Sequence, residues 1–404
     1  MSQRRIQGGV EGDGSWGIGG ARRWASGSRS VIRRNQNRRP QAAATRIARA
    51  SAGAGPAGYT PDMSIEAGSA GPCLVTGATG LVGNNVVRLL VDRGIPVRVL
   101  VRPGSPVGDA ALDGLPVERI AGGLADEATL EAAVAGATRV IHAAAFVHFG
   151  WRHGAEMREV NVEGTRRIAR AARRAGARVV HVSSVDAIGL EPDGGPADED
   201  TPPGVMPECP YVVTKREAEA ALLEEVDCGL DAVIVNPVYM IGPWDWKPSS
   251  GRMLLEVGAG KGLLAPLGAN DFVDVRDVAA GILAALDRGT TGRRYILGGH
   301  GLSYLEAWRI FARVTGRRPP LGTAPRAAVR IAGLVGDLAA SLRRREPDVN
   351  SAATAMSMLA HNFSCRRAEA ELDYRYRPLD ESAADAWRWF LARGYVRGAA
   401  ATRR

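Results

Sequence analysis

The sequence predicts an α/β fold in which a doubly wound parallel sheet is followed by a smaller C-terminal lobe. Continuous apolar runs such as PVRVLVR, ATRVIHAAA, ARVVHVSS and LDAVIVNP are typical of parallel strands that are buried on both faces. Segments with helical spacing, such as EGTRRIARAARRAG and KREAEAALLEEV, separate these runs. After about residue 236 the alternation weakens into Pro- and Gly-rich loops, the short strand DFVDV and helices. Alternating units of this length indicate a doubly wound sheet, and the remainder forms the smaller lobe.

Residues 1–70 precede the first strand and are predicted to form a disordered basic N-terminal extension. They are rich in Gly, Arg and Ser and lack hydrophobic periodicity. Residues 1–62 carry 11 Arg, no Lys and 3 acidic residues, whereas residues 63–404 carry 41 basic and 40 acidic residues. Because the net charge of +9 falls almost entirely on the extension, we expect no nucleic acid partner. The Arg-rich bias resembles a transit peptide, but a translation start at Met63 is the simpler interpretation.

The composition predicts a globular enzyme of a reducing compartment, which we expect to be cytoplasmic. No apolar run reaches membrane-spanning length, so we expect no integral membrane association. The four cysteines show neither paired nor metal-ligand spacing, which argues against a disulfide framework and a metal site. These cysteines are Cys73, Cys209, Cys228 and Cys365.

The first strand runs into the glycine-rich turn GATGLVG, which places Gly77, Gly80 and Gly83 at the start of a helix. Glycines let such a turn close and let backbone approach a diphosphate, while the helix N-terminus offers N–H groups. The turn therefore predicts nucleotide binding. At the end of the second strand, VLVRPGS carries Arg102 where an acidic residue would hold a ribose diol. A guanidinium can bind a 2′-phosphate, so NADP is favoured over NAD, although Arg102 could also be only an exposed strand-end residue.

The stretch PYVVTK places Tyr211 and Lys215 four residues apart, on one face of a helix. An ammonium near a phenol stabilises phenolate, so we expect Lys215 to lower the pKa of Tyr211 and to make it a general acid or base. About 30 residues upstream, HVSSVDAIG ends a strand at the edge where doubly wound sheets bind ligands. Ser183 and Ser184 there are both candidates to hydrogen-bond a substrate oxygen.

The glycine-rich turn, RVIHAAA, VNVEGT, SSVDAIG, YVVTK and VNPVYMIGP occur in this order. In this respect the chain resembles the extended short-chain dehydrogenase/reductase superfamily, also called the NAD-dependent epimerase/dehydratase family. The resemblance covers roughly residues 72–398 and is greatest to the dihydroflavonol-4-reductase-like branch, which includes hopanoid-associated sugar epimerases. It implies a Rossmann-type NAD(P)-binding domain over residues 71–235 and a substrate-binding lobe over residues 236–400, interleaved with that domain.

The resemblance also implies roles for individual residues. Ser184, Tyr211, Lys215 and Asn161 match the catalytic positions, and His142 is interpreted as a packed core residue. The sequence departs from the family pattern at two places. Gly123 stands where relatives commonly have an aspartate, so the usual side-chain contact to adenine is missing. Asp186 lies where dehydratases carry a catalytic glutamate, but Val185 replaces their neighbouring aspartate, which argues against sugar dehydration. The cofactor-binding positions are Gly77, Thr79, Gly80, Leu81, Val82, Gly83, Arg102, Leu124, Ala143, Ala144, Ala145, Tyr211, Lys215 and Pro237.

Two loops near the expected pocket are rich in aromatic residues. These residues could stack on a ring-containing substrate or pack the two lobes together, and the sequence does not decide between these roles. The segment PRAAVRIAGLVGDLAASLRRR is an amphipathic helix that could touch a membrane surface or cap the pocket, and capping is favoured. The aromatic residues are Phe146, Phe149, Trp151, Trp244 and Trp246.

Together these observations predict an NADP-dependent oxidoreductase that moves hydride between nicotinamide and a carbonyl or secondary alcohol of a small molecule. One alternative is a sugar epimerase that retains its cofactor, and another is a catalytically silent NADP-binding sensor. The intact Ser184, Tyr211 and Lys215 argue against the sensor, since a sensor needs only the glycine-rich turn. A homodimer is left open.

Overall fold

The computed structural model describes residues 71–396, except 106, 344 and 345, and the expectation of disorder over residues 1–70 lies outside these residues. The centre of the described chain is a seven-stranded sheet in which every pairing is parallel, so the predicted doubly wound sheet is confirmed. In spatial order its strands are β10 (Arg294–Leu297), β6 (Ala232–Pro237), β5 (Arg178–Val182), β4 (Arg139–His142), β1 (Cys73–Thr76), β2 (Val97–Val101) and β3 (Val117–Ala121).

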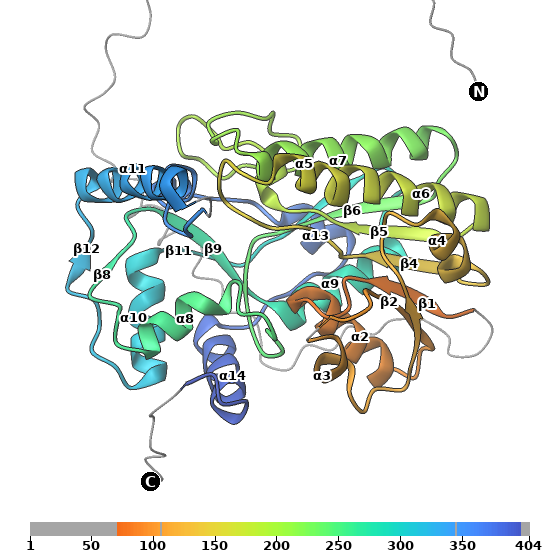
Figure 1. Cartoon of the computed structure of the whole chain (residues 1–404), viewed down its shortest axis with the longest axis horizontal. Coiled ribbons are helices and arrows are strands. Elements are labelled where there is room, and N and C mark those ends of the chain that lie inside the picture. Colours follow the sequence, from red (N-terminus) through yellow and green to blue (C-terminus); the bar gives the residue numbers. More distant parts are fainter. Residues whose placement is uncertain (1–70, 106, 344–345, 397–404) are drawn as a thin grey trace, which may run out of the picture. The chain divides into compact units, whose positions relative to one another are not determined.

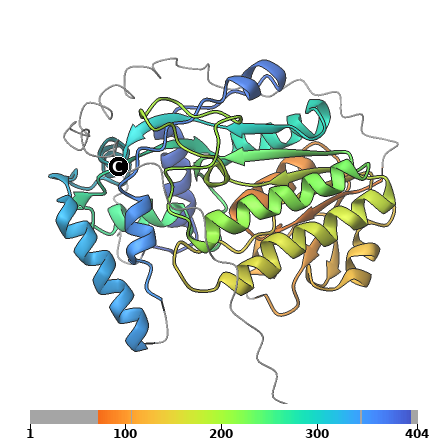
Figure 2. The ribbon, with the colours of Figure 1, turned by 90° about the horizontal axis from the view of Figure 1, so that it is seen from above.

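Helices cover both faces of this sheet, as Figures 1 and 2 show. The inner strands are continuous apolar runs because neither face meets water, and β1 and β6 are buried along their whole length. One face packs on α4 (Glu127–Val134), α6 (Gly164–Ala175) and α7 (Pro210–Asp227), and the other on α2 (Leu81–Asp92) and α9 (Val275–Arg288). The shorter helices of this part are α3 (Gly108–Leu112), α5 (Gly154–Met157) and α13 (Arg366–Glu371).

The strand order reverses between β1 and β4. From β1 the chain adds β2 and β3 on one side, and then β4, β5, β6 and β10 follow on the other side. Thr76 at the end of β1 lies opposite His142 at the end of β4. In sheets of this kind, ligands bind outside the carboxyl ends of the strands at the point of reversal. The sheet therefore positions a site beyond Thr76 and His142.

The second lobe has its own core, in which Phe272, Phe311 and Phe390 are fully buried. Its boundary is not a single point in the sequence, because β10 returns to the large sheet after the chain has entered this lobe. Within the described residues, no helix is long and apolar enough to cross a membrane. The lobe contains the sheet β11 (His300–Ser303), β9 (Ala269–Asp274) and β7 (Tyr239–Ile241), the pair β12 (Gly322–Thr323) and β8 (Leu264–Ala265), and the helices α8 (Gly251–Gly258), α10 (Tyr304–Thr315), α11 (Arg326–Arg343), α12 (Ser351–Met356) and α14 (Leu379–Ala392).

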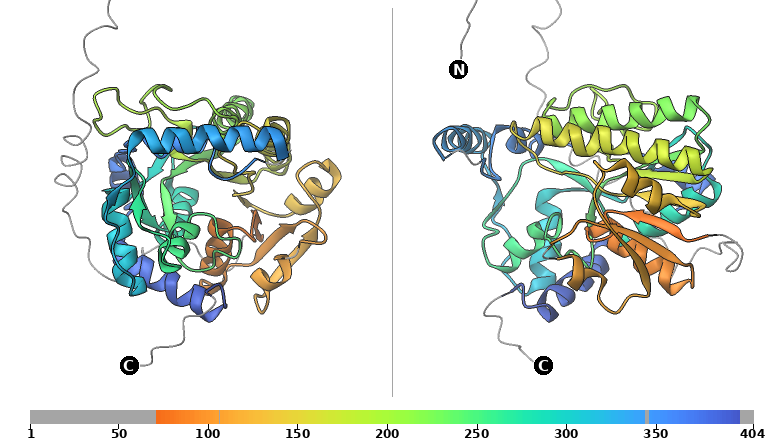
Figure 3. Two further views of the ribbon diagram at one scale, coloured as in Figure 1. Left: turned by 60° about the vertical axis from the view of Figure 1, so that its left-hand side comes forward. Right: turned by 45° about the vertical axis from the view of Figure 1, so that its right-hand side comes forward.

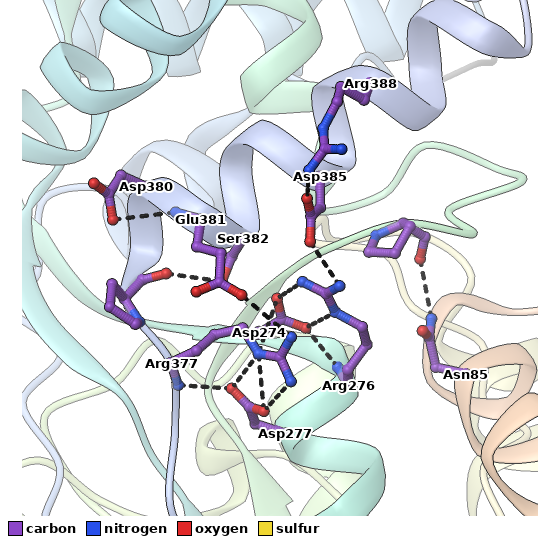
Figure 4. Close-up of polar contacts among 12 residues, drawn as sticks. Asn85, Asp274, Arg276, Asp277, Arg377, Asp380, Glu381, Ser382, Asp385 and Arg388 are labelled. Atoms are coloured by element: carbon purple, nitrogen blue, oxygen red, sulfur yellow. Dashed lines mark hydrogen bonds and ion pairs between the residues drawn. The ribbon is translucent and has the colours of Figure 1, made fainter. Parts of the chain in front are cut away.

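A charged network fastens the second lobe to α9, as Figure 4 shows. Asp274 is the N-cap of α9 and accepts hydrogen bonds from the backbone N–H and the guanidinium of Arg276, at 2.7 and 2.6 Å. The same guanidinium reaches Asp385 on α14 at 2.7 Å. Arg377, just before α14, pairs with Asp277 on α9 at 2.8 Å. Because Asp274 is fully buried, its two guanidinium neighbours are needed to compensate its charge.

Candidate active site and dinucleotide cradle

The turn between β1 and α2 forms a cradle that only glycine fits. Gly77 has φ 72°, and a Cβ there would lie 2.6 Å from the backbone of Ala143. A Cβ on Gly83 would lie 2.2 Å from the carbonyl oxygen of Gly77, so helix and turn are in direct backbone contact. Gly80 is the N-cap of α2, and no side chain in the described part of the chain caps this helix. The free N–H groups and the helix dipole fit a diphosphate, with Thr79 and Val82 half-buried and Leu81 buried beside them.

Arg102 directly follows β2 and is exposed at the same edge of the sheet as the glycine turn. The sequence from Val97 to Ser105 contains no carboxylate. After β3, Gly123 has open space where a Cβ would stand, and Leu124 packs against the start of α6 at Gly164. The strand end predicted to face the adenosine half of a cofactor therefore carries one cation and no acid.

The end of β4 is held to β1 through Thr76. The backbone N–H of Ala143 donates to the Thr76 carbonyl at 3.2 Å, and that of Ala144 donates to the Thr76 hydroxyl at 3.3 Å. His142 bonds the same hydroxyl at 2.8 Å through Nδ1 and that of Thr165 at 3.1 Å through Nε2. Burial, and then the charge of Lys215, lower the pKa of His142 to about 3. His142 is thus a neutral core residue, as expected, while Ala143, Ala144 and Ala145 line the edge.

Tyr211 and Lys215 are one turn apart at the start of α7, and both are buried. Pro210 occupies the first helical turn, where its missing N–H costs no hydrogen bond. The Lys215 ammonium donates to the carbonyl oxygen of Val182 at the end of β5, at 3.1 Å. Burial lowers the pKa of Lys215 to about 8, against the opposing charges of Glu219 and Asp186. The helix therefore carries both side chains to the carboxyl edge of the sheet.

Ser184 follows β5 and caps the short 3-10 turn η2 (Val185–Ala187). Its hydroxyl donates to Asp186 Oδ2 at 2.9 Å, and its carbonyl oxygen accepts from Asn236 at 2.9 Å. Within the described residues the neighbouring Ser183 hydroxyl is buried without a hydrogen-bond partner. Pro237 ends β6 and is buried opposite Leu297.

The pKa of Tyr211 does not follow the expectation of a shift toward neutrality. Burial raises it, the charge of Asp186 raises it further, and hydrogen bonding with Ser184 acts in the opposite direction. The Lys215 ammonium donates to the Val182 carbonyl and does not offset the burial of the Tyr211 phenol. Tyr211 is consequently a protonated donor in this structure, which corrects the argument from Lys215.

Asn161 lies in a π-helical turn, η1 (Arg158–Glu163), between α5 and α6. Its side chain accepts from the N–H of Phe146 at 2.7 Å and donates to the carbonyl of Phe146 at 3.0 Å. It also donates to the hydroxyl of Thr214, next to Lys215, at 3.2 Å. Single π turns occur often at functional sites. Asn161 thereby joins the loop after β4 to the helix that carries Tyr211.

The five predicted aromatic residues fall into two groups. Phe149 lies edge-on to Tyr211 with ring centroids 4.8 Å apart, and Phe146 is held by Asn161. Trp151 is 49% exposed, and its indole N–H donates to Ser351 at 2.7 Å. Trp244 and Trp246 instead pack with other aromatic rings in the core of the second lobe, with Trp389 at 6.0 and 5.2 Å. Packing in the lobe therefore accounts for the two residues of the later loop.

The structure adds His361 to the surroundings of Asp186. His361 is buried after α12, and no hydrogen-bond partner of its Nε2 is found in the described part of the chain. Burial lowers its pKa, and the nearby charge of Asp186 raises it. Burial also raises the pKa of Asp186, with His361, Ser184 and Lys215 acting against it. No sequence motif marks His361, because a bridge between Ala269 and Ala360 brings its segment to the site.

Comparisons with known proteins find a matching family and relatives that are similar along most of this chain. The family described as "NAD dependent epimerase/dehydratase family" matches residues 73–298. Sterol demethylase protein B of Methylococcus capsulatus is 39% identical over 80% of this chain and 99% of its own length. A Synechocystis protein named provisionally as a dihydroflavonol 4-reductase is 35% identical over 80% of this chain and 95% of its own. The solved nucleoside-diphosphate-sugar epimerase of Pseudomonas aeruginosa is 27% identical, with a TM-score of 0.66 over 80% of this chain and 98% of its own.

Proposed function

The chain belongs to the NAD dependent epimerase/dehydratase family and is an NAD(P)-dependent enzyme of the extended short-chain dehydrogenase/reductase type, and from that premise we propose an NADP-dependent oxidoreductase. It would interconvert a carbonyl group and a secondary alcohol on a small, ring-containing substrate. The observation that carries this proposal is the buried group of Ser184, Tyr211 and Lys215 at the carboxyl edge of the sheet, beside a glycine cradle.

The residues of the chain have separate tasks in this reaction. A bound nicotinamide dinucleotide would supply or accept the hydride. Tyr211, which burial keeps protonated, is placed to give a proton to the substrate oxygen during reduction and to take it back during oxidation. The Ser184 hydroxyl would hydrogen-bond the same oxygen as charge develops on it. Lys215, fixed by the Val182 carbonyl, would hold the nicotinamide ribose and offset negative charge near Tyr211.

The preference for NADP rests on the end of β2. Arg102 is exposed at the edge that faces the adenosine ribose in folds of this kind, and no acid stands nearby in that strand. A guanidinium pairs with a phosphate through two parallel hydrogen bonds, which a ribose diol cannot match. Gly77, Gly80 and Gly83 would hold the diphosphate, and Leu124 and Ala143 would flank the cofactor.

A ring-containing substrate is supported by Phe149, which lies against Tyr211 and offers an aromatic surface beside the proton donor. Two relatives similar along most of their length carry names that refer to a sterol and to a dihydroflavonol, which are both fused-ring compounds. The second candidate function is a sugar epimerase with retained cofactor, which the likeness to the Pseudomonas epimerase favours.

The two functions differ in whether the cofactor turns over. The purified full chain is incubated with NADPH and a set of fused-ring ketones, including a sterol-type ketone and a dihydroflavonol, while NADPH absorbance is followed. We expect net NADPH consumption with at least one ketone, and none with the Tyr211→Phe variant. Conversion of a nucleotide sugar into its epimer without net NADPH consumption would instead establish the epimerase. No conversion in either assay would contradict the proposed reaction.

A further inference from the structure

Helix α11 carries a stripe of large apolar side chains that face away from the rest of the lobe. Five residues at helical spacing are each between 60% and 78% exposed. Residues three, four, seven and eleven positions apart share one face of a helix. Figures 1 and 3 show α11 on the outside of the second lobe. We call this stripe the α11 face, and it consists of Ile331, Leu334, Val335, Leu338 and Leu342.

The opposite side of α11 consists of small residues, and their close packing fixes the rotation of the helix about its own axis. Gly333, Gly336 and Ala340 are buried. A Cβ on Gly336 would lie 1.8 Å from the carbonyl oxygen of Val349, so the helix touches the chain before α12 through backbone. Asp337 accepts from the N–H of Ser351 at 3.0 Å. The helix cannot rotate its leucines inward without losing these contacts, so exposure of the α11 face is a property of the packing.

The exposed charged residues described on α11 and shortly before it are arginines. Arg326 and Arg330 are exposed on the same helix, and Arg317 and Arg318 are exposed shortly before it. Asp337 is the sole acidic residue in the sequence between positions 317 and 345, and it is turned toward α12. An apolar stripe flanked by arginines is the pattern of a helix that lies in the interface of a membrane.

We propose that the α11 face docks on the surface of an anionic lipid bilayer, with α11 lying along the interface. Charge complementarity selects this occupant. A second copy would bring two sets of arginines together, and residues 1–62, with 11 Arg and 3 acidic residues, would also be repelled. A helix of 18 residues is about 27 Å long, so its stripe alone is smaller than the roughly 800 Å² per partner of a stable dimer. It is large enough for reversible binding to a bilayer.

The docked face would lie beside the proposed pocket. Arg152 donates to the carbonyl oxygen of Ala340 in α11 at 2.9 Å. Glu346, between α11 and α12, accepts from the backbone N–H of Trp151 at 2.9 Å. The loop that these contacts hold also carries Phe149, which contacts Tyr211. Docking does not depend on the proposed reaction, but it would place the loop that carries Phe149 next to the lipid.

The test is flotation of the purified full chain with vesicles of phosphatidylcholine alone and with vesicles in which about one-third of the lipid is phosphatidylglycerol. We expect binding to the second kind that weakens with added salt, and little binding to the first. The double variant Leu334→Ser/Leu338→Ser should bind at least about tenfold more weakly. Arg326→Gln/Arg330→Gln should lose binding to the anionic vesicles and keep its melting temperature.

Leu391→Ser is the matched control, because Leu391 is an exposed leucine on α14, outside the α11 face. It should bind like the unaltered chain. Equal binding by the double leucine variant would overturn the proposal, since attachment through the Arg-rich residues 1–62 would survive that change. Absence of binding by the unaltered chain would overturn it as well. A fall in molar mass by light scattering in the leucine variant would show instead that a second copy covers the face.

Discussion

Ser184 and Asp186 form two hydrogen bonds with each other, and each residue is the donor in one of them. The Ser184 hydroxyl donates to Asp186 Oδ2 at 2.9 Å, and the backbone N–H of Asp186 donates to Ser184 Oγ at 3.2 Å. A hydroxyl has one proton, so Ser184 cannot donate to a substrate oxygen while it donates to an ionised Asp186. Burial raises the pKa of Asp186, although His361, Ser184, Lys215 and Arg216 oppose the shift. A neutral Asp186 could donate to Ser184 and release the Ser184 proton toward substrate.

Activity should therefore fall as pH rises through the pKa of Asp186, because the ionised carboxylate accepts the hydrogen bond that Ser184 would otherwise donate to the substrate. Asp186→Asn keeps a donor beside Ser184 at all pH values and should remove this part of the profile. The measurement is kcat/KM against pH for both proteins with one ketone substrate. Identical profiles would show that Asp186 does not control Ser184. Ser184→Ala should be slow at every pH tested.

Replacement of Tyr211 by Phe removes the proton donor and leaves the ring that contacts Phe149. Turnover should fall about 10²- to 10⁴-fold, while NADPH affinity changes little. Tyr239→Phe is the matched control, because Tyr239 is a half-buried tyrosine of the second lobe whose hydroxyl donates to the Ser250 carbonyl. The control should keep turnover within a few-fold. Steady-state kinetics and cofactor titration give both quantities, and near-normal turnover in the first variant would contradict its role.

Arg102→Asp should shift cofactor preference from NADPH toward NADH, since it removes the cation proposed to bind the 2′-phosphate and adds a carboxylate for the ribose diol. Loss of NADPH affinity by roughly ten- to a hundred-fold is expected from the missing contacts alone. Arg102→Ala separates the two effects, because it should weaken NADPH without improving NADH. Calorimetric titration of both cofactors into the three proteins tests this, and an unchanged ratio of dissociation constants would assign Arg102 to the surface.

Gly83→Ala should damage the cradle directly, because its Cβ would stand 2.2 Å from the Gly77 carbonyl oxygen and 2.7 Å from the Gly77 carbonyl carbon. Relieving such overlap moves backbone and costs about 1–3 kcal/mol of folding free energy, with loss of dinucleotide affinity. Gly123→Ala is the control, since among the described residues, its two chain neighbours aside, no heavy atom lies within 4 Å of its added Cβ. Urea unfolding and NADPH titration measure the two effects, and equal behaviour of the two variants would refute the close contact.

Asp271 should make stability depend on pH. Burial raises its pKa from 3.8 to about 7, against one hydrogen bond from the N–H of Phe363 at 2.8 Å. Between these two pH values the folded chain holds a proton that the unfolded chain has lost, so the free energy of unfolding falls as pH rises from about 4 to about 7. The fall should amount to about 2–4 kcal/mol.

Asp271→Asn keeps an oxygen for the Phe363 N–H and carries no charge, so it should remove this contribution. The difference in melting temperature between variant and unaltered chain should grow in favour of the variant from pH 4 to pH 8. A difference that is constant over this range would show that Asp271 is ionised throughout.

Much of the fold could be predicted from local patterns. The buried parallel strands are apolar runs, the cradle needs glycine at positions such as Gly77, and the spacing of Tyr211 and Lys215 fixes them on one helical face. These features depend on residues close together in the sequence. The catalytic roles themselves stay predictions until the variants are measured.

Other features of the site and of α11 depend on long-range contacts that the sequence does not predict. His361 reaches Asp186 through a bridge between Ala269 and Ala360, about 90 residues apart, and no spacing rule marks such a pair. The pKa of Tyr211 depends on burial, which the spacing of Tyr211 and Lys215 does not reveal. Helix α11 was expected mainly to cap the pocket, but the sequence could not tell that its glycines, and not its leucines, face α12.

The return of β10 to the large sheet affects how the chain folds while it is being synthesised. Residues Arg294–Leu297 pair with Ile234–Pro237, after a long excursion into the second lobe. Until they arrive, β6 is an open sheet edge of strongly apolar sequence, AVIVNP, which invites pairing with another nascent chain. Chains released early, before about residue 298, should therefore aggregate more than chains shortened at the C-terminal helix α14. Synthesis rate and chaperone supply across this interval would then govern the yield of folded enzyme.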